Sequence, residues 1–134
     1  MNGAKLNLII AEQKAKELFN AVEKSGLIVS GKLESQLSAE IVALAKVRAG
    51  VNTLHPFNGN PIDGLIQNDD IVFLDFGPIF KGWEADLGRT YVIGNDPLKL
   101  KLKNDVELAW QEANNWYATQ KDITGAQYFN YLKE

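Results

Sequence analysis

The stretch that decides the fold is DDIVFLDFGPIFKGWEADLGRTYVIG, residues 69–94. It predicts two strands joined by a tight turn at 80–81 or 81–82, where the glycine of the second pair tolerates the positive φ of a hairpin turn. Any two-residue turn makes the numbers of facing residues sum to an odd value. Asp75 therefore faces an even-numbered residue, and Asp86 lies on its side of the sheet. The two carboxylates are predicted to share one face, either opposite each other or offset diagonally.

The apolar neighbours of these aspartates predict that both are buried. Asp75 follows the apolar run 71–74, and Asp86 precedes the apolar side chains of 87–93. A buried carboxylate costs on the order of several kcal/mol unless it is paired, hydrogen-bonded or bound to a cation. Two carboxylates that lie close together also repel each other unless they share a proton or a metal ion. A cation site would satisfy both requirements.

Strand alternation also allows a second interpretation, in which the aspartates face solvent. The buried face would then consist of Val72, Leu74 and Phe76. Residue types alone leave these two interpretations open.

The pattern of the whole stretch resembles that of the pita-bread metallopeptidases, which include methionine aminopeptidase, proline dipeptidase, aminopeptidase P and creatinase. The matching residues are Leu74-Asp75-Phe76-Gly77, Gly82-Trp83, Ala85-Asp86, Arg89-Thr90 and Val92-Ile93-Gly94. The two aspartates are eleven positions apart, as expected of the first two metal ligands. The Asp-Phe-Gly and Arg-Thr elements resemble the proline-directed branch more than methionine aminopeptidase.

This resemblance implies hydrolysis of peptide bonds, of the Xaa-Pro type, by a hydroxide that bridges two divalent metal ions (Mn, Co or Zn). The family holds these ions with two aspartates, a histidine and two glutamates. Asp75 resembles the ligand of one metal, and Asp86 resembles the bridging ligand. The 48 residues after Asp86 contain no histidine, and their glutamates, Glu107, Glu112 and Glu134, lack the strand context of a ligand. We therefore expect a truncated relative that lacks three of the five ligands and is inactive alone.

Hydrophobic periodicity predicts the order helix, helix, hairpin, helix, helix. The predicted segments are helices at 5–24, 32–49, 97–120 and 124–134, a turn-rich loop at 52–70, and strands within 71–94. Ser30 is the predicted N-cap of the second helix, Pro97 opens the third, and Thr124 begins a capping box with Gln127. This order predicts an α+β fold that resembles the N-terminal half of a pita-bread domain, with the helices on one side of an antiparallel hairpin or small sheet.

The resemblance also implies a substrate-contacting histidine upstream of the first aspartate. His55 precedes Asp75 by 20 residues, which is slightly too far. Asn58, which is followed by a glycine, fits the expected place better. The substrate-orienting role therefore falls to Asn58, or to His55 if a small insertion has displaced it.

Arg89 and the three tryptophans have structural explanations. Arg89 alternates with Asp86, so it is predicted to form an ion pair on the opposite face, with either Glu84 or Glu40. The tryptophans are predicted to lie in the core or at an interface rather than against a substrate: Trp83, Trp110 and Trp116.

Two other families share short pieces of the motif and are excluded. Asp-Phe-Gly is also the metal-binding triplet of protein kinases, but the chain has neither a glycine-rich loop nor a His-Arg-Asp catalytic loop. Retroviral-type aspartic proteases dimerise around Asp-x-Gly, but with a small hydroxyl residue in the middle and an all-strand fold.

Composition sets the remaining limits. The 134 residues carry a net charge of −3, which gives no reason to expect a nucleic-acid partner. The absence of cysteine excludes disulfides and thiolate metal sites. No apolar run is long enough to span a membrane, and no signal-peptide core is found, so cytoplasm is the expected compartment.

A last helix with apolar residues at 128, 129, 131 and 132 would expose an apolar face, which predicts a partner. That partner is either the missing C-terminal half or a second copy in a homodimer. In a dimer, two copies of Asp75 and Asp86 would form a four-carboxylate cluster suited to Mn²⁺, Mg²⁺ or Ca²⁺. Peptide substrate is expected to bind only if the site is completed.

Overall fold

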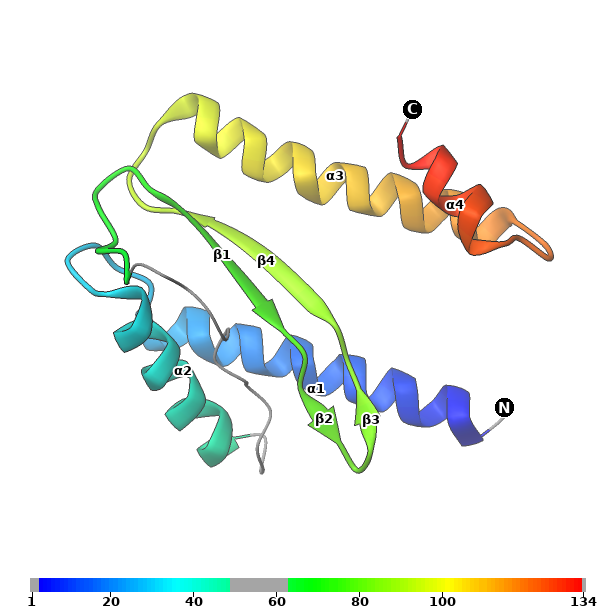
Figure 1. The fold of residues 1–134 in the computed structure, drawn as a ribbon, viewed down its shortest axis with the longest axis horizontal. Helices are drawn as coiled ribbons and strands as arrows, with labels where there is room; N and C mark the ends of the chain where they lie inside the picture. The colour runs from blue at the N-terminus through cyan, green and yellow to red at the C-terminus, as the bar shows by residue number, and fades with distance from the viewer. Residues whose placement is uncertain (1–2, 49–62, 134) are drawn as a thin grey trace. The chain divides into compact units, whose positions relative to one another are not determined.

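The computed structural model describes residues 3–48 and 63–133, which form two compact units, Met1–Asn95 and Asp96–Glu134 (Figure 1). The first unit contains α1 (Gly3–Ser25), α2 (Glu34–Arg48), β1 (Ile71–Phe76), β2 (Ile79–Phe80), β3 (Trp83–Glu84) and β4 (Leu87–Val92). The second contains α3 (Pro97–Thr119) and α4 (Gly125–Tyr131). The predicted α+β order is confirmed. No helix in the described ranges combines the length and the apolar character that a membrane span requires.

The four strands form one long antiparallel hairpin. β1 pairs with β4 and β2 pairs with β3, and the pairing keeps one register throughout, from Ile71 opposite Val92 to Phe80 opposite Trp83. The turn is Lys81-Gly82, the second of the two predicted turns, and both residues have positive φ, 52° and 82°. Two positive φ values in a two-residue loop match the right-handed twist of the strands.

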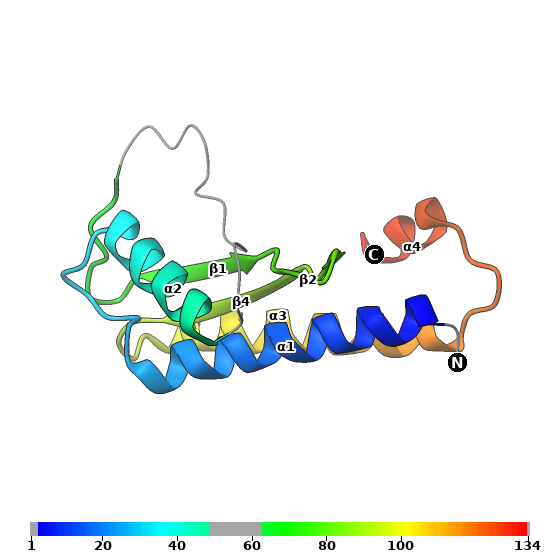
Figure 2. The ribbon, with the colours of Figure 1, turned by 90° about the horizontal axis from the view of Figure 1, so that it is seen from below.

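One face of this hairpin is covered by α1, which contacts both β3 and β4 and lies along the strands (Figure 2). The core of the unit joins α1, α2 and β1, with Ile66 from the preceding segment. Its buried members are Leu18, Phe19, Val22, Leu37, Ile41, Ile66, Leu74 and Phe76. The rings of Phe19 and Phe76 stack with centroids 4.2 Å apart and planes 17° apart. This stacking fixes β1 against the C-terminal half of α1.

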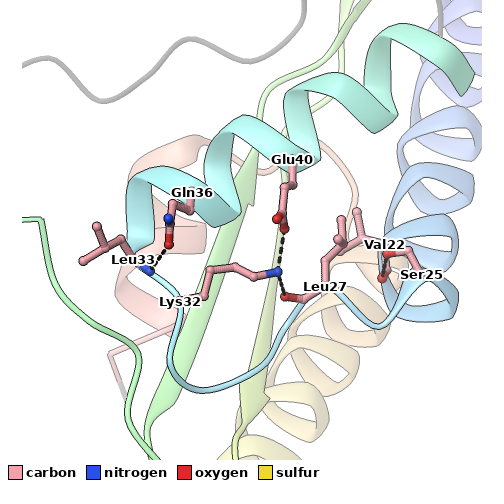
Figure 3. Close-up of polar contacts among 7 residues, drawn as sticks. All are labelled: Val22, Ser25, Leu27, Lys32, Leu33, Gln36 and Glu40. Atoms are coloured by element: carbon pink, nitrogen blue, oxygen red, sulfur yellow. Dashed lines mark hydrogen bonds and ion pairs between the residues drawn. The ribbon is translucent and has the colours of Figure 1, made fainter.

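Polar contacts hold the connection between α1 and α2 (Figure 3). The ammonium of Lys32 donates to the carbonyl of Leu27 at 2.8 Å and to the carboxylate of Glu40 at 2.5 Å. The hydroxyl of Ser25 donates to the carbonyl of Val22 at 2.6 Å and closes the end of α1. The short connection is therefore tied to both helices.

The predicted N-cap of α2 is wrong. Ser30 lies four residues before the first helical residue, Glu34, because the backbone between them pairs with another segment instead. The amide of Gly31 donates to the carbonyl of Ile66 at 2.7 Å, and the amide of Ile66 donates to the carbonyl of Lys32 at 2.9 Å. This pairing is long-range, so local sequence signals did not indicate it.

The side chain that does cap the first turn of α2 comes from far along the chain. Asp63 accepts hydrogen bonds from the amide of Ser35 at 2.9 Å and from its hydroxyl at 2.6 Å. These bonds lower the pKa of Asp63 below 3.8, because they favour the charged carboxylate. An acidic group at a helix N-terminus is also favoured by the helix dipole.

The helices of the second unit begin at the predicted capping residues, but α4 ends at Tyr131, before the predicted end at 134. Asp96 caps α3 by accepting from the amides of Leu98 and Lys99, with Pro97 in the first turn. Thr124 and Gln127 form the predicted capping box of α4. Aromatic stacking then joins the two helices: the ring of Trp116 lies 3.9 Å from that of Tyr131 and 6.2 Å from that of Tyr128.

We expect Leu18→Ala to destabilise the protein far more than Leu8→Ala, although both remove the same side chain from α1. Leu18 is 2% exposed and Leu8 is 49% exposed. The buried change should lower the free energy of unfolding by about 3 kcal/mol, and the exposed one by less than about 1 kcal/mol. Urea denaturation followed by circular dichroism measures both. Equal losses would contradict the placement of the core.

Candidate functional site

The outer face of the hairpin, opposite α1, carries both predicted metal ligands. Asp75 pairs directly with Gly88. The amide of Ala85 donates to the carbonyl of Pro78 at 2.9 Å, so the register continues past β1 and sets Asp86 across from Gly77. The aspartates therefore lie on one face, in diagonal positions, and each has a glycine as its cross-strand neighbour. Because glycines carry no side chain, the positions across from the two carboxylates can accept neighbouring side chains from the same face.

The prediction that both aspartates are buried is wrong, since both are exposed. The second interpretation describes the structure: Leu74 and Phe76 are buried and Val72 is half-buried. The reason is that α1 covers only one face of the hairpin. Among the described residues, the same outer face nevertheless exposes three large apolar side chains. They are Ile71, Phe73 and Ile79.

Two neighbouring side chains lean over the glycines. A methyl group added to Gly88 would lie 2.5 Å from Cζ of Phe73, so the Phe73 ring occupies the space above that glycine. A methyl group added to Gly77 would lie 3.1 Å from Oε1 of Glu84. The carboxylate pair therefore has an aromatic ring at one end and a third carboxylate at the other.

Glu84 is the member of this face that the sequence prediction did not include. The rule that placed Asp86 on the face of Asp75 also places Glu84 there, because it pairs with Ile79. The sequence prediction names Glu84 only as an ion-pair partner of Arg89, which contacts Glu23 instead.

The outer face offers only part of a metal site. Carboxylate oxygens suit hard divalent cations such as Mn²⁺ and Mg²⁺. However, no group of three or more histidine, cysteine, aspartate or glutamate side chains that could hold a metal ion is found in 3–48 and 63–133. Glu107 and Glu112 lie on α3, without strand context, as predicted. The predicted substrate-orienting residues, His55 and Asn58, lie outside the described residues, as does Glu134.

Arg89 forms an ion pair on the inner face, as predicted, but with a different partner. Its guanidinium contacts Glu23 of α1 at 2.7 Å instead of the predicted Glu84 or Glu40. Glu40 pairs with Lys32. Glu23 also accepts from the Tyr91 hydroxyl at 2.9 Å. This partner could not be identified from the sequence because it lies 66 positions away in the chain.

The same contacts fix the protonation of Tyr91. Burial, together with the hydrogen bond to Glu23 and the charge of that carboxylate, raises the pKa of Tyr91 far above its usual value of 10.0. The hydroxyl therefore remains a donor across the whole physiological range. Arg89 and Tyr91 thus tie β4 to α1 and leave the outer face free.

Comparison with known proteins places this arrangement in a family. The sequence model of metallopeptidase family M24 matches residues 7–127. The chain is also similar to a Mycoplasma genitalium protein that is named as an Xaa-Pro aminopeptidase. The two are 30% identical over 83 residues, which are 60% of this chain and 23% of that protein.

Solved structures show the same fold. The prolidase from Pyrococcus furiosus matches with a TM-score of 0.64 and 21% identity, over 84% of this chain and 36% of its own. The prolidase from Pyrococcus horikoshii matches with a TM-score of 0.59 and 21% identity, over 86% and 35%. The chain thus spans about a third of the solved prolidases and about a quarter of the Mycoplasma protein.

Proposed function

Because this chain belongs to metallopeptidase family M24, we propose that it supplies two carboxylate ligands to a divalent-metal site that hydrolyses peptides of the Xaa-Pro type. The observation that carries the proposal is the position of Asp75 and Asp86. Both lie on one exposed face, diagonally across from each other, within the stretch that the family model matches. A metallopeptidase needs such acidic side chains at a surface that substrate can reach.

The donor set supports this role in part. Asp75 and Asp86 would hold the metal through carboxylate oxygens, and both side chains are exposed. A bound divalent metal would polarise the peptide carbonyl and lower the pKa of water. The described residues do not complete a ligand set, so we assign the histidine and the two glutamates of the proposed site to another polypeptide segment.

The inner face of the hairpin would serve this site by keeping it rigid. The Arg89–Glu23 contact and the Phe19–Phe76 stack hold both strands against α1. Ligands need fixed positions, because small displacements of coordinating groups weaken metal affinity considerably. In this proposal, Arg89 therefore positions the site without contacting substrate.

We predict that the chain binds Mn²⁺ and that Asp75→Asn or Asp86→Asn weakens this binding at least about tenfold, because each removes a charged ligand. Isothermal titration calorimetry measures the affinity. Asp105→Asn is the matched control, since it removes an exposed aspartate that pairs with a lysine on α3. Unchanged affinity in the Asp75 and Asp86 variants would contradict the proposal.

Xaa-Pro hydrolysis is predicted only when the rest of the site is supplied in trans. Release of proline from Xaa-Pro dipeptides with Mn²⁺ should be absent for the chain alone. It should appear on addition of the C-terminal segment of an M24 relative, and Asp75→Asn should abolish it. No turnover in any such mixture would argue against a catalytic role.

A second candidate function is that of a non-catalytic, self-associating protein. The observation that favours it is the exposed apolar surface of the outer face, where Phe73 is 60% exposed and Ile79 is 42% exposed. Apolar surface of this kind favours association. Two copies joined at this face would bring four motif carboxylates together, and such a cluster would require a bridging cation.

For this second candidate, analytical ultracentrifugation should show a dimer that requires a divalent cation. Ile71→Ser should shift the distribution toward monomer by removing apolar surface from the outer face, whereas Leu8→Ser on α1 should not, since it removes exposed apolar surface from a different element. A monomer at all concentrations, with and without Mn²⁺, would exclude the homodimer.

A further inference from the structure

We propose that Phe73 determines substrate specificity at the outer face. Its ring forms an apolar wall beside Asp75, and this wall favours peptides with a large apolar residue before proline over peptides with glycine there. This inference deepens the proposed function and rests on it, because it assigns a preference to the same site. The class of ligand is a short peptide in which an apolar residue precedes proline.

The first reason is the exposure of the ring. Phe73 is 60% exposed, whereas the next residue, Leu74, is 8% exposed and lies in the core. Phe73 pairs with Thr90 and lies on the face that α1 does not cover. Its ring therefore makes no contribution to the buried core, and its apolar surface is available to a ligand.

The second reason is that the backbone is shaped to receive the ring. The ring crosses diagonally to Gly88, and any Cβ at that position would lie 2.5 Å from Cζ and 2.8 Å from Cε2 of Phe73. Diagonal neighbours lie within reach of aromatic side chains in antiparallel pairs. Because Gly88 is also the cross-strand partner of Asp75, the ring is held next to that carboxylate.

The third reason is that the face has two chemically different ends. Phe73 and Ile71 lie on one side of the aspartate pair, and Ile79 and its cross-strand partner Glu84 lie on the other, where the Glu84 carboxylate reaches over Gly77. Placing the ligand's apolar side chain against the Phe73 ring removes apolar surface from water, which is favourable. Placing it against Glu84 would remove water from a carboxylate, which is unfavourable. A ligand held at the aspartates should therefore place its apolar side chain toward Phe73.

The test uses the chain mixed with the C-terminal segment of an M24 relative. Isothermal titration calorimetry without added metal compares the binding of Leu-Pro and Gly-Pro, and kcat/KM for the two dipeptides is compared with saturating Mn²⁺. We expect Leu-Pro to bind about tenfold more tightly than Gly-Pro, as is typical for an apolar side chain in an apolar subsite. Phe73→Ser should reduce this ratio to about one by weakening Leu-Pro alone. Gly88→Ala should also reduce it, because it displaces the ring while keeping the phenyl group.

Ile79→Ser is the matched control. It removes an exposed apolar side chain from the same face, but at the end occupied by Glu84, so the ratio should not change. Circular dichroism verifies that each variant is folded. Since Phe73 lies outside the core, Phe73→Ser is expected to fold even if Gly88→Ala does not.

Three results would overturn the inference. They are equal ratios in the wild type and Phe73→Ser, an equal loss in Ile79→Ser, and a wild-type mixture that hydrolyses both dipeptides without preference. The metal proposal fails separately, when Mn²⁺ does not bind or when Asp75→Asn leaves its affinity unchanged. A chain that binds Mn²⁺ but does not discriminate between the dipeptides would refute only the role of Phe73.

Discussion

The packing of α1 against one side of the hairpin is the constraint on which the first unit depends. A strand presents alternate side chains to opposite faces, so a single helix can bury only half of them. In this chain the buried half includes Phe76, stacked on Phe19, and the same helix supplies Glu23 to Arg89. The other half, with both motif aspartates, is left at the surface. The chemistry of the outer face follows from what the helix does not cover.

The features that could be predicted from the sequence are those set by local signals. Helical periodicity, the capping box at Thr124 and the glycine of the turn each depend on a few adjacent residues, and all appear in the structure. The cap of α2 could not be predicted in this way. It comes from Asp63, and the N-terminal approach to the helix pairs with residues near Ile66, contacts that no local pattern indicates.

The candidate site was predictable in geometry but not in environment. With any two-residue turn, strand alternation places Asp75 and Asp86 on the same face. The same rule also places Glu84 on that face. Burial depends instead on which face the helix covers. Both faces of β1 carry apolar residues, Phe73 on one and Leu74 on the other, so composition could not decide between them. Likewise, the partner of Arg89 is set by the docking of α1.

The tight Lys81-Gly82 turn has a consequence for the order of folding. Its strands are neighbours in the chain, so their pairing requires little loop closure and belongs to the microsecond events of hairpin formation. The contact between Glu23 and Arg89 joins residues 66 positions apart and must close a much longer loop. We therefore expect the hairpin to form first and α1 to pack against it in a later step of folding.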